Sequence, residues 1–275
     1  MRIRVLGSAA GGGVPQWNCA CAVCGRARAE GTSRLQDTVA VSGDGAAWYL
    51  INAAPDVRAG ILAAPELRPG PGLRDTPLRG VLLTTAELDH TLGLLTLREA
   101  VRLRVFATET VRTALTSAFP VLPTLAGYTD LELCELSGPV ELEGGLEVRR
   151  LTVGSKRPRY VTELSAGDWV SAVRVTDRGT GESFVYATCL PEWTEAFDAF
   201  LGGATSVLLD GTFGTEDELT VMTGRPGSAR SMGHLPMSVS REHMARHPGT
   251  RFRFGHLNNT NPATGDGIVA DGDLL

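Results

Sequence analysis

The chain has 275 residues, of which 43% are hydrophobic, and a formal net charge of −5. This length suits one large α/β domain or two small ones, and the apolar fraction is enough for a substantial core. The negative charge and the lack of a Lys/Arg-rich block argue against nucleic-acid binding. The sequence has no apolar run long enough for a signal peptide or a membrane span, and clustered cysteines fit a reducing compartment, so we expect a cytoplasmic protein.

Short apolar runs alternate with helical stretches and turn residues along the chain. Strands are predicted at residues 3–6, 39–42, 48–52, 80–84, 103–106, 146–151, 172–176, 183–187, 207–210 and 251–255. Helices are predicted at residues 55–63, 91–100, 110–119, 191–201 and 238–247. This order predicts an α/β fold of two stacked mixed sheets with outer helices, in a single domain that spans residues 1–275.

Three cysteines lie within six residues, at Cys19, Cys21 and Cys24, just after a glycine-rich turn. This spacing cannot close three thiols into local disulfides, but it can place three thiolates around one face of a tetrahedral zinc ion. The fourth ligand must then come from a distant segment. The pattern therefore predicts a structural zinc in an N-terminal loop at about residues 7–30.

Two further features near these patterns have structural interpretations. The glycines between residues 7 and 13 follow a strand, but they lack the Gly-Lys-Ser/Thr of a phosphate loop. We interpret them as a close backbone approach beside the metal sites. Cys189 ends a predicted strand and Cys134 lies in an unrecognised region, and both are interpreted as structural thiols.

The predicted strand at residues 80–84 runs directly into a cluster of possible metal ligands. Glu87 and Asp89 are two residues apart and can converge, and His90 begins the next helix. Carboxylates with an imidazole suit iron, manganese or zinc. Taken alone, residues that cap the next helix would explain the pattern equally well.

The second half of the chain repeats this arrangement. Asp210 ends an apolar strand, His234 lies in a turn before a helix, and His256 follows the last predicted strand. A mononuclear iron(II) oxygenase needs two histidines and one carboxylate with open coordination positions. His90 and His256 with one of Asp89, Glu87 or Asp210 could supply them. His234 is either a further ligand or an acid–base group, and His243 and His247 are predicted on the surface.

These residues resemble the metallo-β-lactamase superfamily, whose hallmark is a strand followed by H-x-H-x-D-H, a later acid and a final histidine. Only Asp89 and His90 match the leading motif, because Thr85 and Glu87 occupy its first two histidine positions. The segments at 7–21, 52–56, 84–95, 232–238 and 256–262 are similar to the coenzyme pyrroloquinoline quinone (PQQ) biosynthesis protein B family. That family usually has Asp at the position of Thr85. The superfamily resemblance also implies that another metal ligand often lies near the position of Cys189.

The resemblance implies a metallo-β-lactamase-like αββα sandwich with two metal sites. Cys19, Cys21 and Cys24 would hold the structural zinc, with Asn259 or a water as its fourth ligand. The active-site metal, expected to be Fe²⁺, would be bound among Glu87, Asp89, His90, Asp210 and His256. His234, Glu87 and Asp89 would be the catalytic side chains.

The resemblance also implies an iron- and oxygen-dependent hydroxylase of a tyrosine-derived intermediate. The partner would be a small aromatic amino-acid intermediate or its carrier peptide, and Arg34 is the candidate for binding a substrate carboxylate. A metallohydrolase that cleaves an amide or phosphodiester, and a non-catalytic quinone carrier, are the alternatives. No nucleic-acid or membrane partner is expected, and a homodimer is possible.

Overall fold

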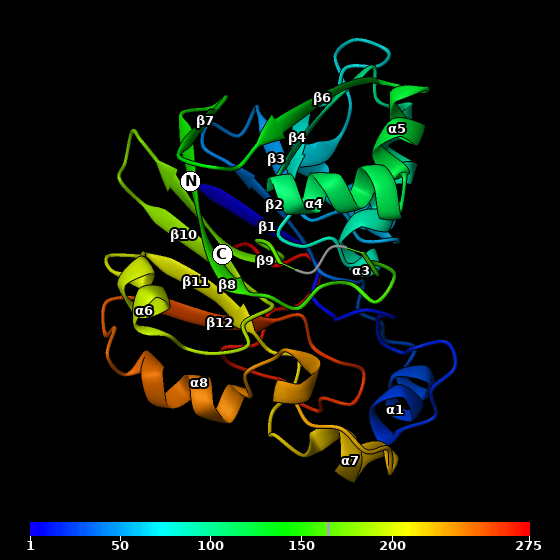
Figure 1. Cartoon of the computed structure of the whole chain (residues 1–275), viewed down its shortest axis with the longest axis vertical. Helices are drawn as coiled ribbons and strands as arrows, with labels where there is room; N and C mark the ends of the chain where they lie inside the picture. Colours follow the sequence, from blue (N-terminus) through cyan, green and yellow to red (C-terminus); the bar gives the residue numbers. More distant parts are fainter. Residues whose placement is uncertain (164–165) are drawn as a thin grey trace.

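Two six-stranded mixed sheets form the frame of the computed structural model, which describes residues 1–163 and 166–275 (Figure 1). The first sheet has the order β1 (Arg2–Gly7), β2 (Thr38–Ser42), β3 (Trp48–Ile51), β4 (Leu78–Leu82), β5 (Arg102–Ala107), β6 (Asp130–Glu135). The second has the order β12 (Arg251–Gly255), β11 (Ser206–Asp210), β10 (Ser183–Ala187), β9 (Val170–Asp177), β8 (Leu146–Gly154), β7 (Val140–Leu142). Each sheet has an antiparallel part and a parallel part, as the sequence predicts.

The three largest apolar cores of the described residues show why the strands are hydrophobic on both faces. In β3, Tyr49 and Ile51 pack between the two sheets, while Trp48 and Leu50 pack on the opposite face. Successive side chains of a strand point to opposite faces, so a strand buried on both sides is apolar throughout. A third core lies on the outer face of the second sheet. Two stacked sheets with helices outside are therefore the observed architecture.

Short helices cover the two outer faces (Figure 1). The first sheet carries α2 (Val57–Ala63), α3 (Leu88–Thr91), α4 (Glu109–Thr113) and α5 (Val121–Ala126), and the second carries α6 (Glu195–Leu201) and α8 (Met237–Met244). Two others, α1 (Ala22–Glu30) and α7 (Glu218–Thr223), lie at the lower right of Figure 1. None of the described helices has the length and apolarity needed to cross a membrane.

Two predicted helices differ in type from the structure. The helix predicted at residues 91–100 is mostly the 3₁₀ segment η2 (Leu92–Glu99), preceded by α3. The helix predicted at 110–119 is α4 followed by the π-helical turn η3 (Ala114–Ala118). Segments of this kind are short because their hydrogen-bond geometry is poorer than that of an α-helix. They carry buried side chains on one side, which produces the same apolar spacing as an α-helix.

The ends of several strands meet at one edge of the sandwich. β4 runs parallel to β3 and β5, and β11 runs parallel to β10 and β12. The carboxyl ends of parallel strands lie at a common edge, where open α/β sheets place their ligands. The segments that follow β4, β10, β11 and β12 therefore hold the candidate site.

Candidate metal centre

The cysteine cluster is brought together as the sequence predicts. The sulfur atoms of Cys19, Cys21 and Cys24 lie within 4.8 Å of one another. Thiolates about 2.3 Å from one tetrahedral zinc are roughly 3.8 Å apart, so small side-chain adjustments would let all three bind one ion. The loop differs from the prediction in one respect. Its last nine residues form α1, and Cys24 is buried in the first turn of that helix.

Asn259 reaches this cluster from the far end of the chain. Its side-chain Nδ2 lies 3.1 Å from Cys19 Sγ, 3.5 Å from Cys24 Sγ and 3.8 Å from Cys21 Sγ. Rotation of the amide by about 180° exchanges the nitrogen with the oxygen, which is the ligand atom that zinc requires. The geometry therefore fits Asn259 as the fourth ligand.

Two buried imidazoles form the centre of the second cluster. His90 and His256 are 1% and 4% exposed, and their ring centroids are 5.3 Å apart. Among residues 1–163 and 166–275, neither Nε2 atom has a hydrogen-bond partner. Each Nδ1 is hydrogen-bonded to a threonine hydroxyl, at 2.8 Å from Thr85 for His90 and 2.8 Å from Thr212 for His256. This arrangement orients each free Nε2 as a metal ligand requires.

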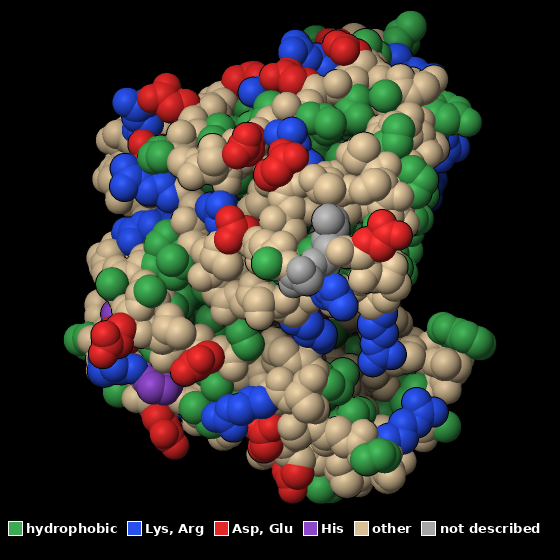
Figure 2. Space-filling view, in the orientation of Figure 1, with side chains coloured by type: hydrophobic (Ala, Val, Ile, Leu, Met, Phe, Trp, Pro, Cys, Tyr) green, Lys and Arg blue, Asp and Glu red, His purple; other side chains and the backbone are tan. Residues whose placement is uncertain are grey.

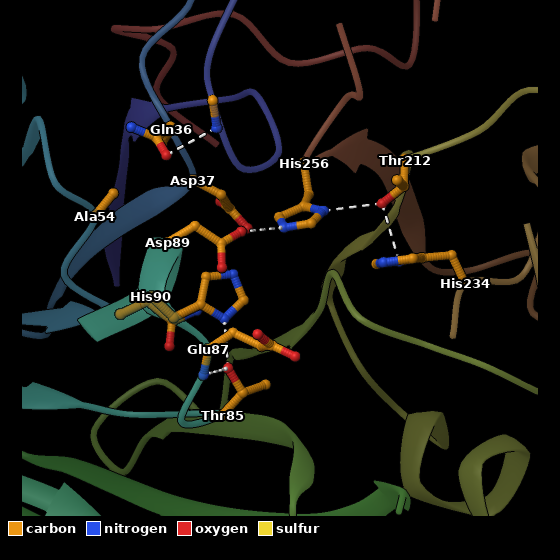
Figure 3. A network of polar contacts seen from close by, with 12 residues as sticks. Gln36, Asp37, Ala54, Thr85, Glu87, Asp89, His90, Thr212, His234 and His256 are labelled. Atoms are coloured by element: carbon orange, nitrogen blue, oxygen red, sulfur yellow. Dashed lines mark hydrogen bonds and ion pairs between the residues drawn. The ribbon is translucent and has the colours of Figure 1, made fainter. Parts of the chain in front are cut away.

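Asp89 adds a carboxylate beside this pair (Figure 3). Its Oδ2 lies 3.6 Å from His256 Nε2, which is less than the roughly 4.2 Å that two ligand atoms can span across one metal ion. Burial disfavours the charged carboxylate, but the imidazoles of His90 and His256 outweigh burial and lower the pKa of Asp89. Burial lowers the pKa of His90, which favours the neutral imidazole that binds metals.

Asp210 and His234 form a neighbouring pair. His234 Nδ1 lies 2.8 Å from Asp210 Oδ2, and the Oδ1 and Oδ2 atoms of Asp210 accept backbone N–H groups from Thr212 and Leu190. Ligand atoms of Asp210, His234 and His256 lie within 4.8 Å of one another. Because Asp210 is held by three hydrogen bonds, its position fits an orienting role toward His234 as well as metal binding.

Glu87 and Thr85 occupy the positions of the missing histidines. Glu87 is half-buried, and burial together with the charge of Asp89 raises the pKa of its carboxyl group. The backbone N–H of Glu87 donates to Thr85 Oγ1, the hydroxyl that also contacts His90. Thr85 thus orients an imidazole where the superfamily hallmark has a ligand.

The glycine-rich loop approaches the centre closely, as the sequence indicates. A Cβ atom added at Gly11 would lie 3.0 Å from Asp89 Oδ2 and 3.3 Å from Asp89 Cβ. A side chain at this position would displace the carboxylate. The loop also pairs with the segment after β12, because the backbone N–H of Ala10 donates to the Leu257 carbonyl.

Two further side chains, Cys189 and Asp37, also belong to this region, and only Asp37 had no role in the sequence analysis. Cys189 Sγ lies within 4.8 Å of ligand nitrogens of both His90 and His256, which differs from its interpretation as a packing thiol. Burial and the surrounding carboxylates raise the pKa of this thiol well above its ordinary range. Asp37 is 2% exposed, and its charge acts on both imidazoles.

A buried chain of hydrogen bonds holds Asp37 in place. Its Oδ2 accepts from the Tyr186 hydroxyl at 2.5 Å, and that hydroxyl accepts from Asn52 Nδ2 at 2.8 Å. Asn52 Oδ1 in turn accepts from the backbone and side chain of Thr84, two residues beyond the end of β4. The network links the two sheets beneath the imidazoles.

Tyr186→Phe is expected to lower the free energy of unfolding by about 1–3 kcal/mol, because Asp37 and Asn52 each lose a buried partner. Urea unfolding measures this change. Tyr128→Phe is the matched control, because Tyr128 is 68% exposed and its loss of a hydroxyl should have no measurable effect. Equal stability of the two variants would contradict the network.

Other predicted residues lie outside this cluster. Arg34 donates from Nη1 to Ser8 Oγ at 2.9 Å and to the Val269 carbonyl at 2.6 Å, so it ties the C-terminal segment to the first sheet instead of facing the imidazoles. His243 and His247 are half-buried rather than fully exposed, and both contact the ring of Trp193.

Comparison with known proteins defines the class first. Residues 47–256 match the family model described as a β-lactamase superfamily domain. A structure described as a new diphosphatase from the PhnP family is 22% identical with a TM-score of 0.71, and it covers 100% of this chain and 96% of its own. At that identity it shows only the fold. The fold, the strand-end ligands and the family match place the chain in the metallo-β-lactamase superfamily.

Nearer relatives narrow this to one family. Coenzyme PQQ synthesis protein B of Azoarcus sp. (strain BH72) is 39% identical over 95% of this chain and 91% of the relative. The protein of that name from Bradyrhizobium diazoefficiens is 39% identical over 96% of this chain and 91% of the relative. The structure of zinc-bound PqqB from Methylobacterium extorquens has a TM-score of 0.90 at 32% identity. The match covers 100% of this chain and 99% of that one. The chain belongs to the coenzyme PQQ synthesis protein B family.

Proposed function

We propose that this protein is a non-haem iron oxygenase that hydroxylates the ring of a tyrosine-derived intermediate in PQQ synthesis. The observation that carries the proposal is the pair of buried, unpartnered Nε2 atoms of His90 and His256 with the Asp89 carboxylate 3.6 Å from one of them. Two histidines and one carboxylate with open positions are typical of iron(II) sites that use oxygen. Thr85 in place of a ligand histidine supports one catalytic metal rather than two.

The donor set fits a divalent ion at this position. Buried imidazole nitrogens without partners are rare in folded proteins, because each unsatisfied polar group costs about 1–3 kcal/mol. A metal would satisfy both His90 and His256, and Asp89 would bind beside them. The zinc-bound relative supports metal binding in this family, and the identity of the ion here is part of the proposal. Bound iron would supply the activation of molecular oxygen.

Side chains around the centre have separate tasks in this proposal. His234 holds or transfers a proton in this proposal, because its Nδ1 contacts Asp210 at 2.8 Å, an arrangement that orients the ring. Glu87, whose pKa is raised by burial and by Asp89, is a second candidate for proton transfer. Asp210 positions His234 and does not need to touch the substrate.

Cationic side chains near Glu87 suit an acidic substrate. The charges of Lys156 and Arg159 act on the Glu87 carboxyl group, so both lie near the centre. Figure 2 shows Lys and Arg side chains gathered beside the hollow at the right of this face. An amino-acid intermediate cross-linked to glutamate carries several carboxylates, which guanidinium groups bind well. These residues replace Arg34 as candidates for substrate binding.

The proposal is tested by turnover of a tyrosine-derived substrate with iron(II), ascorbate and ¹⁸O₂. One oxygen atom replaces a ring C–H with C–OH, and the other leaves as water with two protons and two electrons from ascorbate. We expect one ¹⁸O for each hydroxyl group formed and no product without oxygen. The readout is the mass of the product.

Two results would contradict the oxygenase. Product that forms equally well under strict anaerobiosis and carries only water-derived oxygen would favour a metallohydrolase. Tight binding of the quinone with no conversion of any tested precursor would favour a carrier. A matched reaction in H₂¹⁸O with unlabelled oxygen distinguishes hydrolysis from exchange.

A further inference from the structure

We propose that Cys189 is a thiolate ligand of the active-site metal, so that two imidazoles, one thiolate and the Asp89 carboxylate surround one ion. The inference rests on the proposed metal centre and adds a ligand that the two-histidine, one-carboxylate pattern does not contain. It assigns a chemical role to a thiol for which the sequence favoured a structural role over metal binding.

The geometry of three side chains carries this inference. Ligand atoms of His90, Cys189 and His256 all lie within 4.8 Å of one another. Metal–nitrogen bonds of about 2.1 Å and metal–sulfur bonds of about 2.3 Å allow separations up to roughly 4.4 Å, so small movements would bring all three to one ion. The Nε2 atoms of both imidazoles are buried and, within the described part of the chain, have no hydrogen-bond partner, and His256 Nε2 lies 3.6 Å from Asp89 Oδ2.

The fold holds Cys189 at this place independently of a metal. β10 ends at Ala187 between β9 and β11, which puts the next residues at the same sheet edge as Asp210. The backbone N–H of Leu190 donates to Asp210 Oδ2 at 2.8 Å and fixes the turn directly after Cys189. The sulfur is therefore delivered by a hydrogen-bonded strand end rather than by a free loop.

Ligand chemistry explains why this thiol would bind. Cys189 is half-buried beside the two buried imidazoles. A thiol that coordinates a divalent cation loses its proton. One thiolate and one carboxylate would neutralise the charge of a divalent ion between two neutral imidazoles. Sulfur would also make the centre softer and increase its affinity for thiophilic ions.

Cobalt(II) provides a readout that does not depend on catalysis. Cobalt bound by a thiolate has a charge-transfer band in the near ultraviolet, which nitrogen and oxygen ligands do not produce. We compare the wild-type chain with Cys189→Ser at equal zinc content, adding cobalt in steps. Exchange into the Cys19–Cys21–Cys24 site would contribute equally to both proteins, so their difference spectrum reports Cys189 alone.

We expect the wild type to show the charge-transfer band and Cys189→Ser to lack the part of the band that comes from Cys189. The variant should also bind cobalt about 10–100-fold more weakly, a range typical of perturbed metal sites. Cys134→Ser should match the wild type, because its sulfur contacts Glu132 far from the centre. Circular dichroism verifies that both variants are folded, and Cys189→Ala repeats the test if the serine variant is not.

Identical cobalt spectra and affinities in wild type and Cys189→Ser would overturn the inference. Loss of the band without oxygen-dependent turnover in either protein would refute the oxygenase and leave the thiolate ligand in place. Oxygen-dependent turnover with iron, together with identical cobalt spectra of the wild type and Cys189→Ser, would support the oxygenase and refute the thiolate ligand. The two proposals therefore fail separately.

Discussion

Cys21→Ser is expected to remove about one zinc ion per chain and to lower the melting temperature. Three sulfurs within 4.8 Å of one another and the Asn259 amide join the N-terminal loop to the segment after β12. A ligand that binds only the folded state stabilises a protein by about 4 kcal/mol when the free ligand concentration is 1,000 times the dissociation constant. Metal analysis and thermal unfolding measure the two effects.

The control for this substitution is Cys134→Ser, which removes a thiol from β6 without touching the cluster. It should keep its zinc and melt close to the wild type. A Cys21→Ser protein with full zinc content and an unchanged melting temperature would show that the cysteines do not hold a structural ion. Chelator treatment of the wild type should reproduce the lower melting temperature.

The clustering of the three cysteines was predictable because their sulfurs lie close together in the sequence. A C-x-C-x-x-C spacing leaves few ways to satisfy three thiols, so local chemistry determines the outcome. The distant partner, Asn259, came only from resemblance to a family. Nothing in its local sequence distinguishes an amide that faces three sulfurs from one that caps a turn.

Some residues of the candidate active site could be predicted because they lie just after a strand. Asp89, His90 and His256 follow apolar strands, and parallel strands deliver such residues to one edge. Cys189 follows β10 and Asp37 directly precedes β2. The sequence favoured packing for Cys189 and gave no signal for Asp37, because a single thiol or acid beside a strand also fits simple packing. Only the stacking of two sheets brings them to the imidazoles.

The sequence did not predict the helix types of η2 and η3 or the elements within residues 121–142. η2 and η3 have apolar spacing that an α-helix would also show, and only tertiary packing selects the tighter or wider turn. β6 and β7 are half-exposed and lack a clean apolar alternation, so they were missed. Edge strands have this weak pattern because one side of each faces solvent.

His256→Ala is expected to abolish binding of the active-site metal and to leave the cysteine-bound zinc in place. His256 contributes the central imidazole, since its ring lies 5.3 Å from that of His90 and 5.6 Å from that of His234. Its removal takes a ligand from both groups of potential metal-binding atoms. Metal analysis after reconstitution with iron(II) should find only the zinc.

The backbone at His256 requires a second variant. Its φ of 56° lies in the left-handed region, which alanine adopts at a cost of about 1 kcal/mol and glycine adopts freely. His256→Gly therefore removes the imidazole without adding backbone strain, and His243→Ala controls for loss of a histidine outside the centre. Loss of both metals from the glycine variant would mean that the two sites form one mechanical unit, because Asn259 lies only three residues beyond His256. Retention of iron would show that the metal is held elsewhere. If iron alone is lost, the segment after β12 supplies one ligand to each of two separate ions.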